Sequence, residues 1–212
     1  MTATSLDPKS AWSGEFGDDY AGRNVASEQA LRERTAMWAR VGQAFMGDPP
    51  RSILEVGCNI GINLRALPRL FDAELYAIEP NATARERVLA DKVLPPERLF
   101  AGFGEELPLP DGAVEMAFTS GVLIHIEPER LGATMDEVHR VSSKYVLCSE
   151  YFSPRPETIT YRGHEGLLFK NDFGGLYMDR FPDLELVDYG FFWKRATGLD
   201  DPTWWLFRKK AG

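Results

Sequence analysis

Two acidic residues, Glu55 and Glu79, each end a short apolar run, and glycines follow the first of them at positions 57 and 61. A glycine turn after a buried strand lets a ligand approach backbone N–H groups at the start of a helix. An acid at the end of the next strand can accept hydrogen bonds from both hydroxyls of a ribose. The spacing therefore predicts a β-loop-α-β unit that holds a nucleoside.

Asn59 occupies the middle small position of this loop, where a dinucleotide-binding loop needs glycine to admit a pyrophosphate. Asparagine tolerates left-handed backbone geometry, so the turn can still form, but its side chain disfavours NAD and FAD. A ligand with a ribose, a positive sulfonium and no phosphate suits two acids and this loop better. S-adenosylmethionine is such a ligand, and Glu55 would lie beneath it.

Length and composition point to one globular domain, because 212 residues with 44% hydrophobic and 26% charged residues are ordinary for a single core. The net charge of -8 disfavours nucleic acid and anionic membranes as partners. Two cysteines without a spaced framework and an N-terminus without a leader pattern favour a soluble protein of the reducing cytoplasm. We expect a monomer or homodimer that acts on a small molecule.

Strands and helices are expected to alternate through the middle of the chain, which predicts a parallel sheet covered on both faces. A helix over 27–46, capped by Ser27, comes first. The expected strands are 52–56, 74–79, 98–101, 114–119 and 144–149, with helices near 62–70, 81–91 and 129–141. A helix near 172–180 and strands 184–192 and 203–208 follow. The fold class is thus α/β, Rossmann-like and seven-stranded, mostly parallel with the last strand antiparallel.

Within a single domain of residues 1–212, we expect a helical lid over 1–48, a cofactor-binding core over 49–150, an acceptor-side insertion over 151–172 and a C-terminal helix and hairpin over 173–212. Residues 1–10 are polar and expected to fray. Trp12, Phe16 and Tyr20 lie four apart and would share a helix face. The stretch from Tyr151 to Lys170 is expected to be long and irregular, and loops of that kind tend to be functional.

Several segments in chain order resemble the class I S-adenosylmethionine-dependent methyltransferases. Ile53-Leu-Glu-Val-Gly-Cys-Asn-Ile-Gly61 is similar to the first motif of that family and Ala77-Ile-Glu-Pro80 to the second, in which the acid binds the ribose. Gly102 to Gly112 is similar to the adenine-side loop, although Phe103 stands where many members have an acid. Phe118 to Ile126 resembles the fourth motif, which passes beneath the methionine part of the cofactor.

More narrowly, the chain resembles the pseudaminic acid biosynthesis-associated methylases over roughly residues 12–207. Ser120-Gly-Val-Leu-Ile-His-Ile126 and Tyr161-Arg-Gly-His164 are among the segments that carry this likeness. The resemblance implies methyl transfer in a biosynthetic pathway. It also implies a set of cofactor contacts: Tyr20, Arg23, Asn24, Glu55, Gly57, Cys58, Asn59, Gly61, Asn63, Glu79, Pro80, Asn81, Phe103, Gly104, Glu105, Ser120, Gly121 and Val122.

Methyl transfer from a sulfonium is an in-line displacement that needs positioning more than activation, so we expect no metal and no covalent intermediate. If the acceptor is a hydroxyl or ammonium, a base must remove its proton. His125 is the base candidate because it follows the fourth strand of the core, where ligands gather in open α/β sheets. Alternatively, His125 is a buried turn residue that only packs or contacts the cofactor.

The residues before the first long helix could fold over the cofactor, with Arg23 or Asn24 meeting its carboxylate. The alternative is that the aromatic residues there only pack. For the acceptor we expect an oxygen or nitrogen atom of a small polar metabolite. Arg162 and Lys170 would suit an anionic one, such as a sugar acid, amino acid or phosphonate, or could pair with nearby acids instead. The expected acceptor site comprises Glu150, Tyr151, Tyr161, Arg162, His164 and Lys170.

Two other functions compete with this interpretation. An NAD-dependent oxidoreductase would use the same α/β scaffold, but Asn59 argues against it. A non-catalytic subunit that binds an adenosyl ligand would retain the cofactor motifs without needing a developed acceptor region. The sequence names neither the acceptor nor the accepting atom.

Overall fold

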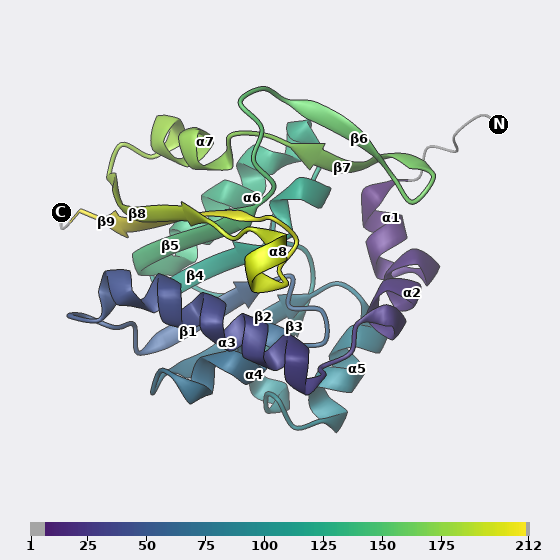
Figure 1. Cartoon of the computed structure of the whole chain (residues 1–212), viewed down its shortest axis with the longest axis horizontal. Helices are drawn as coiled ribbons and strands as arrows, with labels where there is room; N and C mark the ends of the chain where they lie inside the picture. The colour runs from purple at the N-terminus through teal and green to yellow at the C-terminus, as the bar shows by residue number, and fades with distance from the viewer. Residues whose placement is uncertain (1–6, 211–212) are drawn as a thin grey trace.

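The computed structural model describes residues 7–210 of the chain. Of residues 1–10, which were expected to fray, residues 1–6 lie outside the described residues, whereas 8–10 belong to helix α1 Pro8–Ser13, so the expectation is wrong there. One seven-stranded sheet forms the centre, in the order β3-β2-β1-β4-β5-β9-β8 (Figure 1). Its strands are β1 Ser52–Val56, β2 Glu74–Glu79, β3 Leu99–Ala101, β4 Val114–Ser120, β5 Ser142–Glu150, β8 Leu184–Phe191 and β9 Thr203–Lys209.

Strands β1 to β5 pair in parallel, and β9 runs antiparallel to both β5 and β8. The expected fold class, with an antiparallel last strand, is confirmed. Strand β9 enters the sheet between β5 and β8, so the C-terminal hairpin adds its second strand inside and leaves its first at the edge. The sheet order reverses between β1 and β4, which is the position where ligands bind in open α/β sheets.

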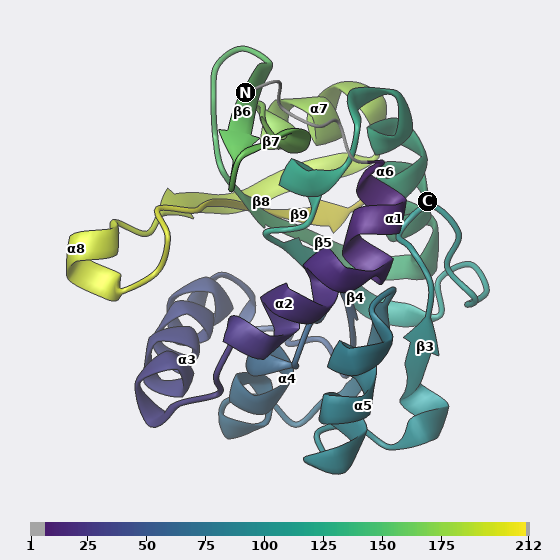
Figure 2. The same cartoon turned by 90° about the vertical axis from the view of Figure 1, so that its right-hand side faces the viewer.

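Helices cover both faces of the sheet, as the alternating pattern predicts (Figure 2). On one face lie α3 Glu28–Gly42, α4 Ile62–Ala66 and α5 Ala82–Ala90, and on the other α6 Pro128–Val141 and α7 Phe173–Arg180. Ser27 caps α3 by accepting a hydrogen bond from the Ala30 N–H at 3.1 Å, as expected. Among the helices of residues 7–210, none has the length and apolar character needed to cross a bilayer.

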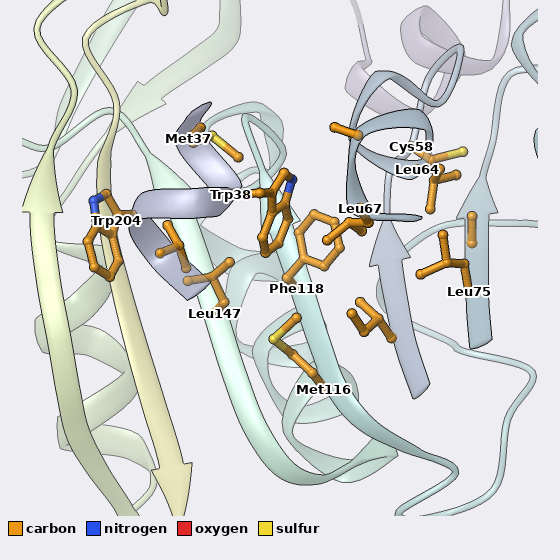
Figure 3. Packing of buried hydrophobic residues seen from close by; sticks show 14 of the residues in the cluster. Met37, Trp38, Cys58, Leu64, Leu67, Leu75, Met116, Phe118, Leu147 and Trp204 are labelled. Carbon is orange, nitrogen blue, oxygen red and sulfur yellow. The ribbon is translucent and has the colours of Figure 1, made fainter. Parts of the chain in front are cut away.

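Two large hydrophobic clusters form most of the core, one on each face of the sheet, and a small third one joins Ala21, Ile60 and Ala84. In the first, Trp38 of α3 packs edge-on against Phe118 of β4 with ring centroids 4.9 Å apart (Figure 3). Both side chains are fully buried. Of the predicted lid, α3 therefore belongs to the core, where large aromatic burial fixes it against the strands that carry the glycine loop.

The N-terminal aromatic residues lie on two helices rather than on one. Helix α1 Pro8–Ser13 ends at Gly14, and α2 Glu15–Arg23 follows at once. A Cβ at Gly14 would lie 2.8 Å from the Ser10 carbonyl oxygen, so this close approach of the backbone needs glycine. The spacing of four still brings the rings of Trp12 and Phe16 together, at 5.1 Å.

The stretch expected to be irregular contains a β-hairpin, so that expectation is wrong. Strands β6 Glu157–Tyr161 and β7 His164–Lys170 pair antiparallel, and Tyr161 faces His164 across the turn. Arg162 and Gly163 form the two-residue turn with φ of 52° and 83°. Two successive positive φ values match the twist of the hairpin. Glycine at the second position adopts a positive φ without steric strain. Polar and apolar residues are mixed in both strands, so no run of apolar residues in the sequence indicates them.

Candidate functional site

A cleft opens at the carboxyl ends of β1, β2 and β4, beside the reversal of strand order. It holds about 840 Å³ of space, its open mouth included. Its floor comes from the loops after these strands, and its outer wall from α1 and α2, which lie across this end of the sheet (Figure 2). A concave site at this place in an open α/β sheet is where small-molecule ligands bind.

The glycine loop has left-handed backbone geometry at Gly57, Asn59 and Gly61, with φ of 75°, 47° and 75°. A Cβ at Gly57 would lie 2.6 Å from Val122 Cγ2, so this position requires glycine for space as well as for conformation. Asn59 adopts the conformation for which asparagine is tolerated, and its Oδ1 accepts the Ile60 N–H at 2.7 Å. The loop therefore holds its shape without a middle glycine.

Glu79 lines the cleft, and each of its carboxylate oxygens accepts one backbone hydrogen bond. Oε2 accepts the Asn59 N–H at 2.7 Å, and Oε1 accepts the Asn81 N–H at 2.9 Å. Burial raises the pKa of this carboxyl, and the two N–H groups oppose that rise. Each oxygen keeps a second lone pair, so Glu79 can also accept from two hydroxyls of a ribose.

Glu55 lies beneath the loop and does not line the cleft. It is buried, and its Oε1 accepts a hydrogen bond from Asn63 Nδ2 at 2.5 Å, while Trp38 Nε1 donates to Asn63 Oδ1 at 3.1 Å. Burial raises the pKa of Glu55 to about 8. Among the described residues its Oε2 has no hydrogen-bond partner. Glu55 and Asn63 thus support the site from below rather than contacting a ligand in the cleft.

Another part of the cleft lining is the loop after β3, with Phe103, Gly104 and Glu105. The resemblance implies that this loop lies on the adenine side. Glu105 ties this loop to two other elements, because Lys9 of α1 lies 2.6 Å from its Oε2 and Arg130 of α6 pairs with its Oε1. Lys9 also lies over the Phe103 ring at 5.0 Å. The ion pairs fix α1 across this end of the cleft.

Helix α2 continues the cover over the middle of the cleft. Asp18 accepts a hydrogen bond from Asn81 Nδ2 at 2.9 Å, and Arg87 of α5 donates to the carbonyl oxygens of Ala21 and Asn24. Asn24 Nδ2 reaches Asn59 Oδ1 at 3.3 Å. The cover is therefore anchored to the loops it spans at several points.

His125 lies in the short 3₁₀ helix Leu123–His125 after β4 and lines the cleft. Its Nδ1 lies 2.6 Å from the Leu167 carbonyl oxygen, and because a carbonyl only accepts, Nδ1 carries the proton. Burial lowers the pKa of His125 to about 4, so the ring is neutral near pH 7. Nε2 then has a free lone pair, and this is the atom that can accept a proton.

Glu150 does not contact the cleft, contrary to its expected place among the acceptor residues. It is fully buried at the end of β5, where its Oε2 accepts the N–H groups of Val122 at 3.0 Å and Ile124 at 3.4 Å. Burial raises its pKa to about 7. Glu150 positions the segment that carries His125, because it satisfies backbone donors that no helix or strand pairs.

The other expected acceptor residues lie on the β6–β7 hairpin or beside it, outside the cleft lining. The Tyr161 ring lies 5.5 Å from His125, which brings the hairpin to the outer edge of the cleft. The two cations stack on tyrosines, Arg162 over Tyr161 at 5.5 Å and Lys170 over Tyr151 at 5.8 Å. The structure therefore does not bring these cations together in the cleft.

The expected cofactor contacts divide into two sets by position. Those that line the cleft are Tyr20, Gly57, Asn59, Glu79, Pro80, Asn81, Phe103, Gly104, Glu105, Gly121 and Val122. Those that do not are Arg23, Asn24, Glu55, Cys58, Gly61, Asn63 and Ser120. Most of the second set hold the loops in shape. Arg23 instead lies over the Tyr20 ring at 5.9 Å and is exposed.

Sequence reasoning missed Arg34 and the cleft-lining role of Trp12. Arg34 of α3 donates from Nη1 to Ser120 Oγ at 3.4 Å, and its Nε is buried without a partner among residues 7–210. Desolvation lowers its pKa, while the nearby Glu55 carboxyl raises it. Its place in an ordinary amphipathic helix gave no signal, because the sequence does not show which residue of α3 faces the end of β4.

Comparisons with known proteins agree with this geometry. The sequence model of a methyltransferase domain family matches residues 54–146, which include the glycine loop, Glu79 and His125. A search of curated proteins found no match. No group of three or more metal-ligating side chains occurs in the part of the chain that the structure describes.

Solved structures share the whole architecture. The 1,6-didemethyltoxoflavin N1-methyltransferase of Burkholderia thailandensis, solved with 1,6-didemethyltoxoflavin and S-adenosylhomocysteine, is 18% identical, with a TM-score of 0.68 over 100% of this chain and 94% of that chain. A Leishmania major S-adenosylmethionine-dependent methyltransferase is 13% identical, with a TM-score of 0.72 over 96% of this chain and 87% of that chain. The magnesium protoporphyrin IX methyltransferase of Synechocystis is 11% identical, with a TM-score of 0.65 over 99% of this chain and 100% of that chain. At these identities the likeness shows the fold.

Proposed function

We propose that this chain, whose residues 54–146 match a methyltransferase domain family, is a class I S-adenosylmethionine-dependent methyltransferase that transfers the methyl group to an oxygen or nitrogen atom of a small polar metabolite. The observation that carries the proposal is Glu79, a cleft-lining acid at the end of β2 whose two oxygens are oriented by the glycine loop and by Asn81. The small molecules named for two fold neighbours, didemethyltoxoflavin and magnesium protoporphyrin IX, support an acceptor of this general kind.

The residues of the cleft fit this cofactor. Glu79 would hold the ribose hydroxyls, the Gly57 turn would admit the ligand close to the backbone, and Phe103 with Gly104 would hold the adenine. When bound, the cofactor supplies a methyl group that its sulfonium has already activated. The protein then has to bind, orient and exclude water, and the cover made by α1 and α2 suits the last of these tasks.

Arg34 replaces Arg23 and Asn24 in our assignment of the group that meets the amino-acid end of the cofactor. Arg34 does not line the cleft, but its hydrogen bond to Ser120 places the guanidinium at the carboxyl end of β4, and its buried Nε has no hydrogen-bond partner among residues 7–210. Arg23 points to the Tyr20 ring, and Asn24 is engaged with Asn59. A partly desolvated guanidinium suits carboxylate recognition because its donors form a rigid fork.

His125 would act as the base where the acceptor group loses a proton. Its Nδ1–H is held by the Leu167 carbonyl, so Nε2 is oriented as the acceptor of that proton. The acceptor atom's lone pair forms the new bond to the methyl carbon, and the proton moves to Nε2 and then to water. Glu150 supports this arrangement as a positioning residue, through the backbone of the His125 segment.

The resemblance to pseudaminic acid-associated methylases suggests a biosynthetic acceptor, and the anionic alternative depends on Arg162 and Lys170. Both cations lie over tyrosine rings outside the cleft, which weakens the anionic alternative. A non-catalytic role would leave the oriented imidazole without a purpose. The proposed function thus keeps a small polar acceptor and a base.

Isotope-labelled S-adenosylmethionine tests this proposal. Purified protein is incubated with it and a small-metabolite extract, and any methylated product is identified by mass spectrometry. We expect label in a small molecule with the wild type and none with Glu79→Ala, while Glu74→Ala, on the exposed start of the same strand, should behave as the wild type. Cofactor binding without label transfer under these conditions would contradict the enzymatic role.

A further inference from the structure

Six aromatic rings from five elements meet at the outer end of the cleft. They are Trp12 of α1, Phe16 and Tyr20 of α2, His125 after β4, Tyr161 of β6 and His164 of β7, and we call them the aromatic cluster. Trp12 is at the centre, with centroid distances of 4.4 Å to His125, 5.1 Å to Phe16 and 5.2 Å to Tyr20. Phe16 in turn lies 5.9 Å from His164.

One side of the aromatic cluster faces the cleft. Trp12, Tyr20 and His125 line it together with Gly121 and Val122, the segment that resembles the floor of the methionine site. The remaining rings form a second row behind, on α2 and the β6–β7 hairpin. An acceptor that reaches the methyl-bearing end of the cofactor must therefore pack against these rings.

Two polar atoms of the aromatic cluster are buried and have no hydrogen-bond partner among the described residues. They are Trp12 Nε1, which can only donate, and His164 Nδ1. Buried polar groups are nearly always paired, because an unpaired one loses its bond to water without a replacement. Trp12 also lines the cleft, so its unpaired N–H belongs to a residue that a ligand there would contact.

The Lys and Arg side chains of the cleft lining and of the hairpin turn are already engaged. Lys9 and Arg130 pair with Glu105, and Arg162 lies over the Tyr161 ring on the exposed turn of the hairpin. A site for a carboxylate or phosphonate would instead direct a cation into the space where the acceptor lies. The surface that the aromatic cluster presents to the cleft is largely apolar, and its polar groups include the Trp12 N–H and the Nε2 lone pair of His125.

We propose that the acceptor is an uncharged, planar conjugated ring that carries a carbonyl oxygen or ring nitrogen, which accepts a hydrogen bond from Trp12 Nε1. This inference rests on the proposed function and narrows its acceptor class. Aromatic side chains hold such rings by offset or edge-on packing. The nitrogen or oxygen atom of a ring N–H or O–H group of the acceptor forms the new bond to the methyl carbon, and its proton goes to His125 Nε2. The bond between the methyl carbon and sulfur breaks, and its electron pair stays on sulfur.

Ligand-observed saturation-transfer NMR on protein saturated with S-adenosylhomocysteine tests the inference. The probes are oxindole, which carries a carbonyl, indole of nearly the same size without one, and galacturonate as a sugar acid. We expect oxindole to bind the wild type about tenfold more tightly than indole and galacturonate to bind least. Trp12→Phe should abolish the preference for oxindole over indole, because it keeps an aromatic ring and removes the N–H.

The matched control is Trp193→Phe, since Trp193 is an exposed tryptophan outside the cleft lining. It should keep the oxindole preference. Tighter binding of galacturonate than of either ring, no binding of either ring, or an unchanged oxindole preference in Trp12→Phe would each overturn the inference. Affinity for S-adenosylhomocysteine, measured on the same samples, separates this failure from failure of the proposed function, and its retention in Trp12→Phe shows that the variant is folded.

Discussion

The backbone N–H of Asn59 donates to Glu79 Oε2 at 2.7 Å, so the glycine loop after β1 and the acid at the end of β2 form one unit. The second oxygen of Glu79 is held by the Asn81 N–H at the start of α5. A carboxylate oriented by two backbone donors does not need to reorganise when a ribose binds. The site that we propose for the ribose is therefore pre-formed by hydrogen bonds between consecutive β–α units.

Replacing Glu79 should weaken cofactor binding strongly. Glu79→Ala removes two hydrogen bonds from a charged acceptor, each of which contributes about 1.5 kcal/mol, so we expect a roughly 100-fold loss in affinity for S-adenosylhomocysteine. Isothermal titration calorimetry measures it, with Glu74→Ala as the control on the same strand. Native affinity in Glu79→Ala would refute the ribose assignment.

The left-handed conformation of Asn59 can be tested by substitution. Asn59→Ala and Asn59→Gly both lose the bond from the Ile60 N–H, but alanine also bears the cost of left-handed geometry. We expect the alanine variant to be less stable than the glycine variant by about 1 kcal/mol in urea unfolding. Lys92, at φ 55° in a turn after α5, gives the matched pair Lys92→Ala and Lys92→Gly without the loop contacts. Equal stability of the Asn59 pair, with a difference at Lys92, would show that the loop relaxes.

The low pKa of His125 predicts a pH-dependent stability. The unfolded chain protonates this ring near its ordinary pKa of 6.5, whereas the folded protein does so only near pH 4. Stability should therefore fall as the pH drops from about 6.5 to about 4, and His125 should account for about 3 kcal/mol of that fall. Urea unfolding of the wild type and His125→Gln at several pH values measures it. Parallel curves for the two proteins would contradict the assignment.

The same pKa shift predicts the pH profile of catalysis. Because His125 is neutral above pH 4, its availability as a base should not change between pH 5 and pH 8. Once a methyl acceptor has been identified, we expect the plot of kcat against pH to show no inflection near pH 6.5 from this group. His125→Gln should lower kcat and leave the affinity for S-adenosylhomocysteine nearly unchanged. A variant with weaker cofactor binding and normal kcat would assign His125 to cofactor contact instead.

Arg34 should discriminate between ligands with and without the amino-acid part. Arg34→Met should weaken binding of S-adenosylhomocysteine about tenfold, since a hydrogen bond to a charged group contributes about 1.5 kcal/mol. Methylthioadenosine lacks the amino acid, so its affinity should stay within about twofold of the wild-type value. Arg23→Met is the control, because Arg23 lies over Tyr20 at the surface. Equal losses for both ligands would indicate a packing role for Arg34.

The sequence by itself determined the sheet and the ribose end of the site. Apolar runs of strand length, separated by helical segments, are local patterns, and the expected strands from 52–56 to 203–208 all occur in the structure. Gly57, Asn59 and Glu79 could be identified because they lie at fixed distances from the ends of such runs. Their chemistry depends on local backbone geometry, which short-range sequence largely sets.

Only the tertiary structure decided the acceptor end. The β6–β7 hairpin is mixed in polarity, and its pairing depends on a two-residue turn rather than on an apolar pattern. Glu150 reads as a polar residue at a strand end, yet it is fully buried beneath Val122 and Ile124. Trp12, His125 and Tyr161 are far apart in sequence and meet only because α1, the turn after β4 and the hairpin converge on one cleft. Contacts between distant segments depend on packing of the whole chain, and no local pattern records them.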